Sequence, residues 1–162
     1  LILPGTHSKH LVFEEEKFTG MKNFMTGEVF EVMSQYSILS NSVSGSSWNP
    51  DRESAFVSGL EQGLKGCLTS HLFSIRADHV LKKTSKEDNY FKLSGMVIGD
   101  ELAYLRGHRG MVVVAAPDPM FTFYRTALNR ILLPEQLVLL DQIDLSQALL
   151  IGQKKILELD GK

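Results

Sequence analysis

The run MVVVAA at residues 111–116 constrains the fold of this 162-residue chain more strongly than any other segment. Its consecutive valines, with no polar residue between them, are typical of a strand that is covered on both faces. A helical pattern follows at residues 117–131, and the apolar run LVLL at residues 137–140 then predicts a second strand. The chain closes on a further helical pattern, which we expect to be capped near Asp144 or Ser146. Strands and helices that alternate in this order predict an α/β layered domain.

The first part of the chain predicts a hairpin that leads into a helix. Apolar residues 1–3 and 11–13 flank a polar turn with Pro and Gly at residues 4–9, which is the pattern of a β-hairpin. After residue 20 the apolar period becomes helical, and Thr26 is a suitable N-cap. The apolar face of this helix would carry Val29, Phe30, Met33, Tyr36 and Leu39. A hairpin joined to alternating strands and helices predicts a mixed sheet flanked by helices.

Two more helices are expected before the β-branched run. The first has Asn49 as its N-cap and continues past residue 66 on a regular apolar face. Within it, Gly59, Gly63 and Gly66 favour close packing against a neighbouring helix over a ligand role. The second begins at Ser85, in a sequence that resembles a capping box. These helices supply the layer that the sheet needs on at least one face.

Composition excludes several classes of function. The net charge is −2 and the 17 lysines and arginines are scattered, so nothing suggests a nucleic-acid or membrane-surface binder. The single cysteine, Cys67, excludes an intrachain disulfide, and its apolar helical setting predicts a buried structural thiol in a reducing cytoplasm. No run of about 18 apolar residues is present that would span a membrane. We expect one soluble, cytoplasmic domain, long enough to bury a real core.

The turn at residues 5–9 is the strongest candidate for a binding site. Accessible backbone N–H groups, two hydroxyls and a cation suit it to phosphate oxygens, although its spacing does not match a Walker loop. Taken alone, these residues favour an ordinary hairpin turn over phosphate binding. The helix start after residue 25 could likewise receive an anion, and simple capping is the favoured explanation there. The residues concerned are Gly5, Thr6, His7, Ser8 and Lys9 in the turn, and Thr26, Gly27 and Glu28 at the helix start.

Other polar residues give weaker signals. Asp118, Asp141 and Asp144 follow apolar strand patterns, where carboxylates reach a cleft or a metal-bound water, but solvated turns explain them at least as well. The histidines outside the first turn have no ligand spacing for zinc. Ser8 lies between two histidines without any nucleophile-elbow motif, which excludes a hydrolase.

Three blocks in order, LPGTHSKH, FMTGEVFEVM and YFKLSGMVIGDEL, strongly resemble the bacterial 2-dehydro-3-deoxygalactonokinase family. The resemblance implies a ribonuclease-H-like sheet that forms one lobe of an actin-like ATPase fold, shared with hexokinases and chaperone ATPases. Residues 1–162 would then be the C-terminal, nucleotide-side lobe of a two-lobe kinase, with the N-terminal lobe absent. Such kinases use ATP and Mg²⁺ to phosphorylate 2-dehydro-3-deoxy-D-galactonate to its 6-phosphate in D-galactonate catabolism.

The same resemblance implies roles for individual residues. The five turn residues would face the ATP phosphates, and Thr26, Gly27 and Glu28 would lie close to the cleft. Four more residues, near the nucleotide, would be Gly95, Gly99, Ala116 and Pro117. The family pattern has Gly where Ala116 stands, Leu where Met120 stands and Trp where His10 stands, so the adenine turn and the end of the phosphate turn both depart from it.

The implied mechanism is transfer of the γ-phosphoryl group to a sugar-acid hydroxyl by positioning and charge neutralisation. No catalytic base and no protein metal ligand can be named from the matched segments. The alternatives are a non-catalytic nucleotide-binding module of the same superfamily and a kinase for another sugar acid. The lobe alone is expected to be inactive, and the face left by the missing lobe would favour homo-oligomers.

Overall fold

The β-branched run forms the inner parallel strand of the sheet, as its composition predicts. The computed structural model describes residues 1–160. In it, β4 (Val112–Ala115) lies between two parallel neighbours. The order β3-β2-β1-β4-β5, with antiparallel β1–β2 and β2–β3 pairs, is the expected ribonuclease-H-like mixed sheet. The other strands are β1 (Ile2–Leu3), β2 (Ser8–Glu14), β3 (Lys17–Phe24) and β5 (Leu137–Leu140).

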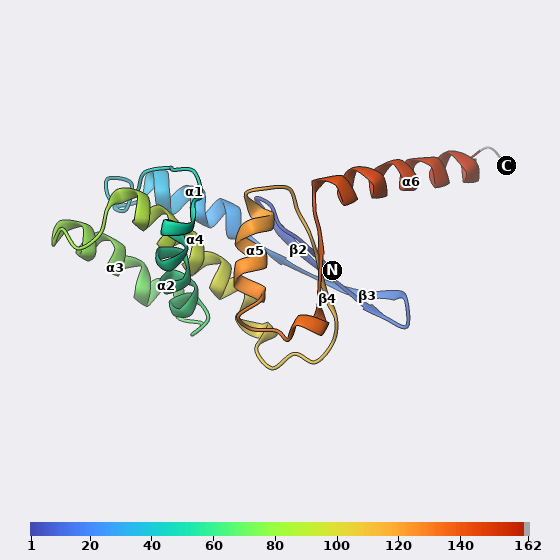
Figure 1. Ribbon diagram of the computed structural model, residues 1–162, viewed down its shortest axis with the longest axis horizontal. Coiled ribbons are helices and arrows are strands. Elements are labelled where there is room, and N and C mark those ends of the chain that lie inside the picture. Colours follow the sequence, from blue (N-terminus) through green and yellow to red (C-terminus); the bar gives the residue numbers. More distant parts are fainter. Residues whose placement is uncertain (161–162) are drawn as a thin grey trace.

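The helices fall into three groups around the sheet (Figure 1). In Figure 1, α1 to α4 gather at one end of the molecule, α5 lies against the sheet, and α6 extends from the opposite end. The helices are α1 (Thr26–Tyr36), α2 (Glu53–Gly63), α3 (Leu68–Val80), α4 (Lys86–Leu102), α5 (Met120–Leu128) and α6 (Gln142–Asp160). Three single 3₁₀ turns occupy Pro50–Arg52, Ala103–Leu105 and Pro134–Gln136.

Helices α2 and α4 pack with their backbones in contact, and glycine makes this possible. A Cβ added at Gly95 would stand 2.0 Å from the carbonyl oxygen of Phe56, and one at Gly59 would stand 1.9 Å from that of Lys92. Gly63 and Gly99 would meet the facing backbone in the same way, at 2.1 and 2.5 Å. Small residues four apart on both helices therefore let the two backbones touch, which confirms the packing role expected for Gly59 and Gly63.

An aromatic cluster fills the space between α2, α4 and α5. The ring of Trp48 lies 5.7 Å from that of Phe56, 5.5 Å from that of Phe91 and 5.3 Å from that of Phe123. All three phenylalanines are buried, and all three of these ring pairs are edge-to-face, the arrangement that aromatic quadrupoles favour. The aromatic residues thus join the loop before α2 to the helices behind the sheet.

Several local expectations are wrong, each for a physical reason. Gly66 does not share the packing role expected for it, because a Cβ there would meet nothing within 4 Å. Its φ of +72° instead ends the expected helical run, so a separate α3 begins at residue 68. Cys67 consequently lies in the connection and is exposed rather than buried. Tyr36 closes α1 with 76% of its surface exposed, because the helix ends there without a further turn to cover it. Asp141, not Asp144 or Ser146, caps α6 by accepting hydrogen bonds from the N–H groups of residues 143 and 144.

The other predicted helix starts hold. Asn49 accepts a hydrogen bond from the Arg52 N–H, and Ser85 accepts one from the Asp88 N–H. Asp88 also contacts the Arg52 guanidinium, and the Ser85 hydroxyl and this cation lower the pKa of the Asp88 carboxyl.

Within the part of the chain that the structure describes, no helix is long and apolar enough to cross a membrane.

We expect the Gly95→Ala substitution to lower the free energy of unfolding by about 1–3 kcal/mol, because its methyl group would overlap the α2 backbone. The matched control is Gly152→Ala in α6, where an added Cβ meets nothing within 4 Å. There alanine should be neutral or stabilising by up to about 1 kcal/mol, since it favours helix. Urea unfolding of both variants is the measurement, and equal stability of the two would contradict the proposed packing.

Candidate functional site

The turn between β1 and β2 is held directly above the first turn of α1. The Glu28 N–H donates to the Thr6 carbonyl at 3.1 Å, and His7 Nε2 lies 2.6 Å from Glu28 Oε2. Lys9 Nζ donates to the His7 carbonyl at 3.3 Å, which folds its side chain back over the turn. Gly5, Thr6, His7 and Lys9 are exposed. The result is a rim of accessible backbone and two basic side chains beside a helix N-terminus.

Gly27 allows the turn and the helix to come this close. A Cβ at Gly27 would lie 2.7 Å from Thr6 Cα and 2.8 Å from the Gly5 carbonyl oxygen. Both neighbours are backbone atoms, so neither can move aside without displacing the turn. The glycine is therefore required by contact with the turn, not by an unusual backbone angle.

Beneath the turn lies a buried carboxylate, that of Glu101 near the end of α4. Glu101 is 2% exposed, and its Oε1 accepts hydrogen bonds from Ser8 Oγ at 2.8 Å and from His10 Nε2 at 2.6 Å. Its other oxygen accepts from the hydroxyls of Thr26 and of Tyr124, the latter at 2.8 Å. Four donors from three elements other than its own thus surround one carboxylate, which compensates for removing its charge from water.

Two phenols respond to this buried charge. Burial, together with the negative charge of Glu101, raises the pKa of Tyr124 well above its ordinary value. The same causes, in the same order, raise the pKa of Tyr104. Both phenols therefore stay protonated and keep their O–H groups available as donors.

His10 extends the cluster towards the sheet edge. Its Nδ1 lies 2.7 Å from the Tyr104 hydroxyl, while its ring packs 4.7 Å from that of Phe24. A neutral imidazole satisfies both contacts by donating from Nε2 to Glu101 and accepting at Nδ1 from Tyr104. Through its two ring nitrogens, His10 therefore links β2 to Glu101 of α4 and to Tyr104, which follows α4 directly.

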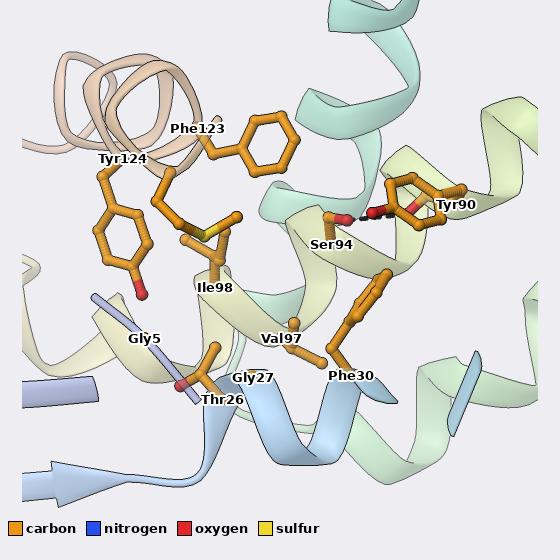
Figure 2. A pocket seen from close by; sticks show the side chains of 11 residues that line it. Gly5, Thr26, Gly27, Phe30, Tyr90, Ser94, Val97, Ile98, Phe123 and Tyr124 are labelled. Carbon is orange, nitrogen blue, oxygen red and sulfur yellow. Dashed lines mark hydrogen bonds between the residues drawn. The ribbon is translucent and has the colours of Figure 1, made fainter. Parts of the chain in front are cut away.

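A small apolar pocket adjoins the same turn (Figure 2). Its volume is about 140 Å³, and Gly5 and Gly27 form the wall next to the turn. Figure 2 shows Phe30 of α1 and Tyr124 of α5 approaching it from different sides, with side chains of α4 between them. The pocket is mostly apolar, so the polar character of the site comes from the rim rather than from this cavity.

The sequence as a whole decides the family. Residues 1–150 match the family model described as 2-keto-3-deoxy-galactonokinase. The chain belongs to this kinase family. Two curated relatives agree with the match: the "Probable 2-dehydro-3-deoxygalactonokinase DgoK1" of Rhizobium meliloti strain 1021 is 33% identical over 132 residues, and the 2-dehydro-3-deoxygalactonokinase of Escherichia coli K12 is 31% identical over 134.

These kinases are longer than the chain. The alignments cover 78% and 79% of this chain but 43% and 44% of the relatives, so the chain spans less than half of their length. The fold agrees as well: a crystal structure of a Sinorhizobium meliloti protein assigned to the 2-dehydro-3-deoxygalactonokinases superposes with a TM-score of 0.77 at 30% identity. That superposition covers 88% of this chain and 47% of the other.

In this member of the kinase family, the residues expected at the phosphates divide between an exposed rim and the buried face of β2. Gly5, Thr6, His7 and Lys9 lie on the exposed rim, as a phosphate site requires. Ser8 does not: it is 0% exposed and its hydroxyl is committed to Glu101. Alternation along the strand explains the correction, since successive side chains point to opposite faces of the sheet.

Two of the residues predicted close to the cleft point in different directions. Glu28 is partly exposed and pairs with His7, whereas Thr26 turns its hydroxyl inward to Glu101 and makes no capping hydrogen bond. The expectation that Thr26 caps α1 is therefore wrong, and Met25 occupies the cap position.

Of the four other residues predicted near the nucleotide, three are buried. Gly95 and Gly99 are buried, and the α2 backbone fills the space next to both of them. Ala116 is buried at the end of β4, where its N–H donates to the Leu140 carbonyl at 3.2 Å, and Pro117 beside it is exposed. Of these residues, only Pro117 presents its surface to solvent.

Sequence reasoning missed Glu101, Tyr104 and Tyr124 as one cluster. The strand period was an available signal, because Ser8 and His10 alternate with the outward-facing Lys9 and therefore share the inner face. Their partner on α4 lies more than 90 residues away along the chain, and no local pattern indicates it.

The acidic residues after the strands serve local structure. Asp118 accepts a hydrogen bond from Thr122 at 2.7 Å, and Asp141 and Asp144 bond to each other's backbone N–H groups at the start of α6. Among residues 1–160, no three His, Cys, Asp or Glu side chains gather as metal ligands would.

We expect Glu101→Gln to destabilise the protein by about 1–3 kcal/mol, because the amide nitrogen cannot accept the hydrogen bonds that one carboxylate oxygen now receives. Glu158→Gln is the matched control, since Glu158 is exposed on α6 and its nearest cation, Lys154, lies 3.8 Å away. Chemical unfolding monitored by circular dichroism measures both. A Glu101→Gln protein as stable as the control would contradict the structural role assigned to this carboxylate.

Proposed function

We propose that this chain is the nucleotide-side, C-terminal lobe of a two-lobe 2-dehydro-3-deoxygalactonokinase that phosphorylates its sugar acid with ATP. The observation that carries the proposal is the turn at residues 5–9, which is exposed except for Ser8 and is fixed above the N-terminus of α1 in a chain of this family. The remaining part of the cleft, including most substrate contacts, would come from a first lobe. A kinase that draws on ATP and a catabolic sugar acid belongs in the cytoplasm.

In this proposal the phosphates of ATP lie on the rim of the turn. The backbone of Gly5 and Thr6 would donate hydrogen bonds, Lys9 would supply positive charge, and His7 would add a side chain that can hydrogen-bond. The N-terminal end of α1 adds a favourable partial charge in the same place. Ser8 contributes from below by fixing the strand rather than by touching a phosphate.

The pocket beside the turn is too small to hold a nucleotide. Its volume of about 140 Å³ falls below the range of roughly 300–1,000 Å³ that ligand pockets usually have. We therefore assign the phosphates to the exposed rim of the turn. We assign the adenosine to the surface near Pro117, where the chain resembles the family's adenosine-binding turn. Ala116 would stand behind that turn as a buried support.

The chemistry would be transfer of the γ-phosphoryl group to the terminal hydroxyl of the sugar acid. The turn's part is to hold the phosphates and neutralise charge that shifts during transfer. The described residues do not fit a magnesium cage, because no group of carboxylates or histidines converges. A Mg²⁺ ion would be carried by the nucleotide phosphates, and we assign neither a metal ligand nor a catalytic base to this chain.

The direct test is a coupled ADP-release assay on the product of the complete gene, with 2-dehydro-3-deoxy-D-galactonate and its gluconate epimer as separate substrates. We expect turnover with Mg-ATP and a strong preference for the galactonate form. Equal turnover of both epimers would point to a broader sugar-acid kinase. ATP binding without turnover of either would favour a non-catalytic nucleotide-binding protein.

The role of the rim predicts that Lys9→Met lowers kcat/KM for ATP by about 10- to 100-fold, which corresponds to one charged hydrogen bond of about 1.5–3 kcal/mol. Lys65→Met, an exposed lysine in the connection after α2, is the matched control and should leave kcat/KM unchanged. Both lysines are exposed, so the free energy of unfolding should change by less than about 0.5 kcal/mol. An active Lys9→Met enzyme with unaltered kcat/KM would remove this residue from the proposed site.

A further inference from the structure

The proposed nucleotide site has two sides that come from distant parts of the chain. Its phosphate side is the turn at residues 5–9 together with the first turn of α1, and its adenosine side is the surface near Pro117. ATP has to meet both sides in one fixed relation, because its adenosine and its phosphates belong to one molecule. A polar connection between the two sides runs through Tyr124 and Glu101.

The adenosine side is fixed to α5. The Phe121 N–H donates to the Pro117 carbonyl at 3.0 Å, and the Thr122 hydroxyl donates to the Asp118 carboxylate at 2.7 Å. Both donors lie in the first turn of α5, so the residues before the helix move with it. A displacement of α5 therefore displaces the surface near Pro117.

Tyr124 carries the connection from α5 to the buried carboxylate. It is 1% exposed, so it lies behind the site and does not reach a bound ligand. Its hydroxyl donates to Glu101 Oε2 at 2.8 Å, and the Thr26 hydroxyl at the start of α1 donates to the same oxygen. Figure 2 shows the Tyr124 hydroxyl directed towards the side of the pocket on which Gly5 and Thr26 lie. One oxygen atom thus holds a donor from each side of the site.

Glu101 extends the connection to the turn itself. Its Oε1 accepts from Ser8 at 2.8 Å and from His10 at 2.6 Å, so the carboxylate also holds the end of the turn and the strand that follows. The donors share the two oxygens of one planar group. A donor that is lost or moved therefore changes the position in which the other donors hold that group.

Apolar packing between the two sides is incomplete. A pocket of about 140 Å³ is lined by Gly5 and Gly27 on the phosphate side and by Met120 and Phe123 on α5. Atoms that face an empty space lose their contacts across it. The hydrogen bonds to Glu101 therefore provide a rigid connection where the packing leaves a gap.

We propose that Glu101 and Tyr124 are positioning residues that couple the adenosine side of the site to its phosphate side. Neither residue touches the nucleotide. They hold α5, α1 and the turn in one arrangement, so that a change on α5 alters how the turn binds phosphate. The inference rests on the proposed nucleotide site and adds to it that the two sides recognise a nucleotide as one unit.

The first test measures the turn without any ligand. In the first turn of a helix an N–H has no intrahelical partner, so the Thr6 carbonyl, 3.1 Å away, is what protects the Glu28 N–H. The hydrogen-exchange rate of this amide, followed by NMR, reports whether the turn stays docked on α1. Tyr124→Phe removes only the hydroxyl that reaches Glu101. We expect it to raise the Glu28 rate about 10-fold, which corresponds to the loss of one hydrogen bond to a charged group.

Two controls separate coupling from a general loss of stability. Tyr36→Phe removes a hydroxyl from an exposed tyrosine at the end of α1 and should leave the Glu28 rate unchanged. The N–H of the buried Ile75, inside α3, should keep its rate in the Tyr124→Phe protein. An unchanged Glu28 rate in Tyr124→Phe, or an equal rise at Ile75, overturns the proposal.

The second test uses a ligand that meets the phosphate side alone. Mg-tripolyphosphate resembles the phosphate chain of ATP without the adenosine, and isothermal titration calorimetry measures its binding to the product of the complete gene. We expect Tyr124→Phe to weaken this binding about 10-fold, although Tyr124 lies on the helix of the adenosine side. Tyr36→Phe should bind it as the native protein does. Circular dichroism at the temperature of the titration checks that each variant is folded.

The outcomes separate this inference from the proposed function. If the native protein binds ADP and tripolyphosphate and Tyr124→Phe binds both equally well, the nucleotide site stands and the coupling alone is overturned. A native protein that binds neither ligand overturns both. Weaker tripolyphosphate binding together with faster Glu28 exchange supports the coupling, and neither measurement depends on which sugar acid the enzyme phosphorylates.

Discussion

The buried carboxylate of Glu101 is the contact on which the geometry of the candidate site depends. Burying one negative charge is costly, and the structure offsets that cost with hydroxyl and imidazole donors from β2, α1 and α5. The donors cannot move independently, because each would leave the carboxylate short of a partner. The strand that carries the turn, the helix below it and the helix behind it are therefore fixed relative to α4.

In β2, the side chains that are held by hydrogen bonds and the side chains that are exposed lie on opposite faces of the strand. Ser8 and His10 point inward and are held by Glu101, while the side chains of His7 and Lys9 lie outside and are exposed to solvent. A site that must grip charged oxygens gains from such a division, because its backbone donors are already positioned before the ligand arrives. Gly27 completes it by letting the N-terminus of α1 touch the turn.

The elements that sequence reasoning recovers are those whose signals are local. The valine run, the hairpin, the Asn49 and Ser85 caps and the glycine spacing in α2 each depend on residues within one or two turns of each other, and all are present. The resemblance also brought the correct family and sheet. The failures were positions where distant contacts decide: Thr26 and Ser8 turn to Glu101, and the face that Gly95 and Gly99 share meets α2.

The α2–α4 contact supports the candidate site from a distance. Paired glycines let the two backbones touch, which fixes α4 within the helical layer. Glu101 lies near the end of α4, so the same contact positions the carboxylate that holds Ser8 and His10 of β2. A side chain that forced α4 away from α2 would therefore displace the turn through this carboxylate.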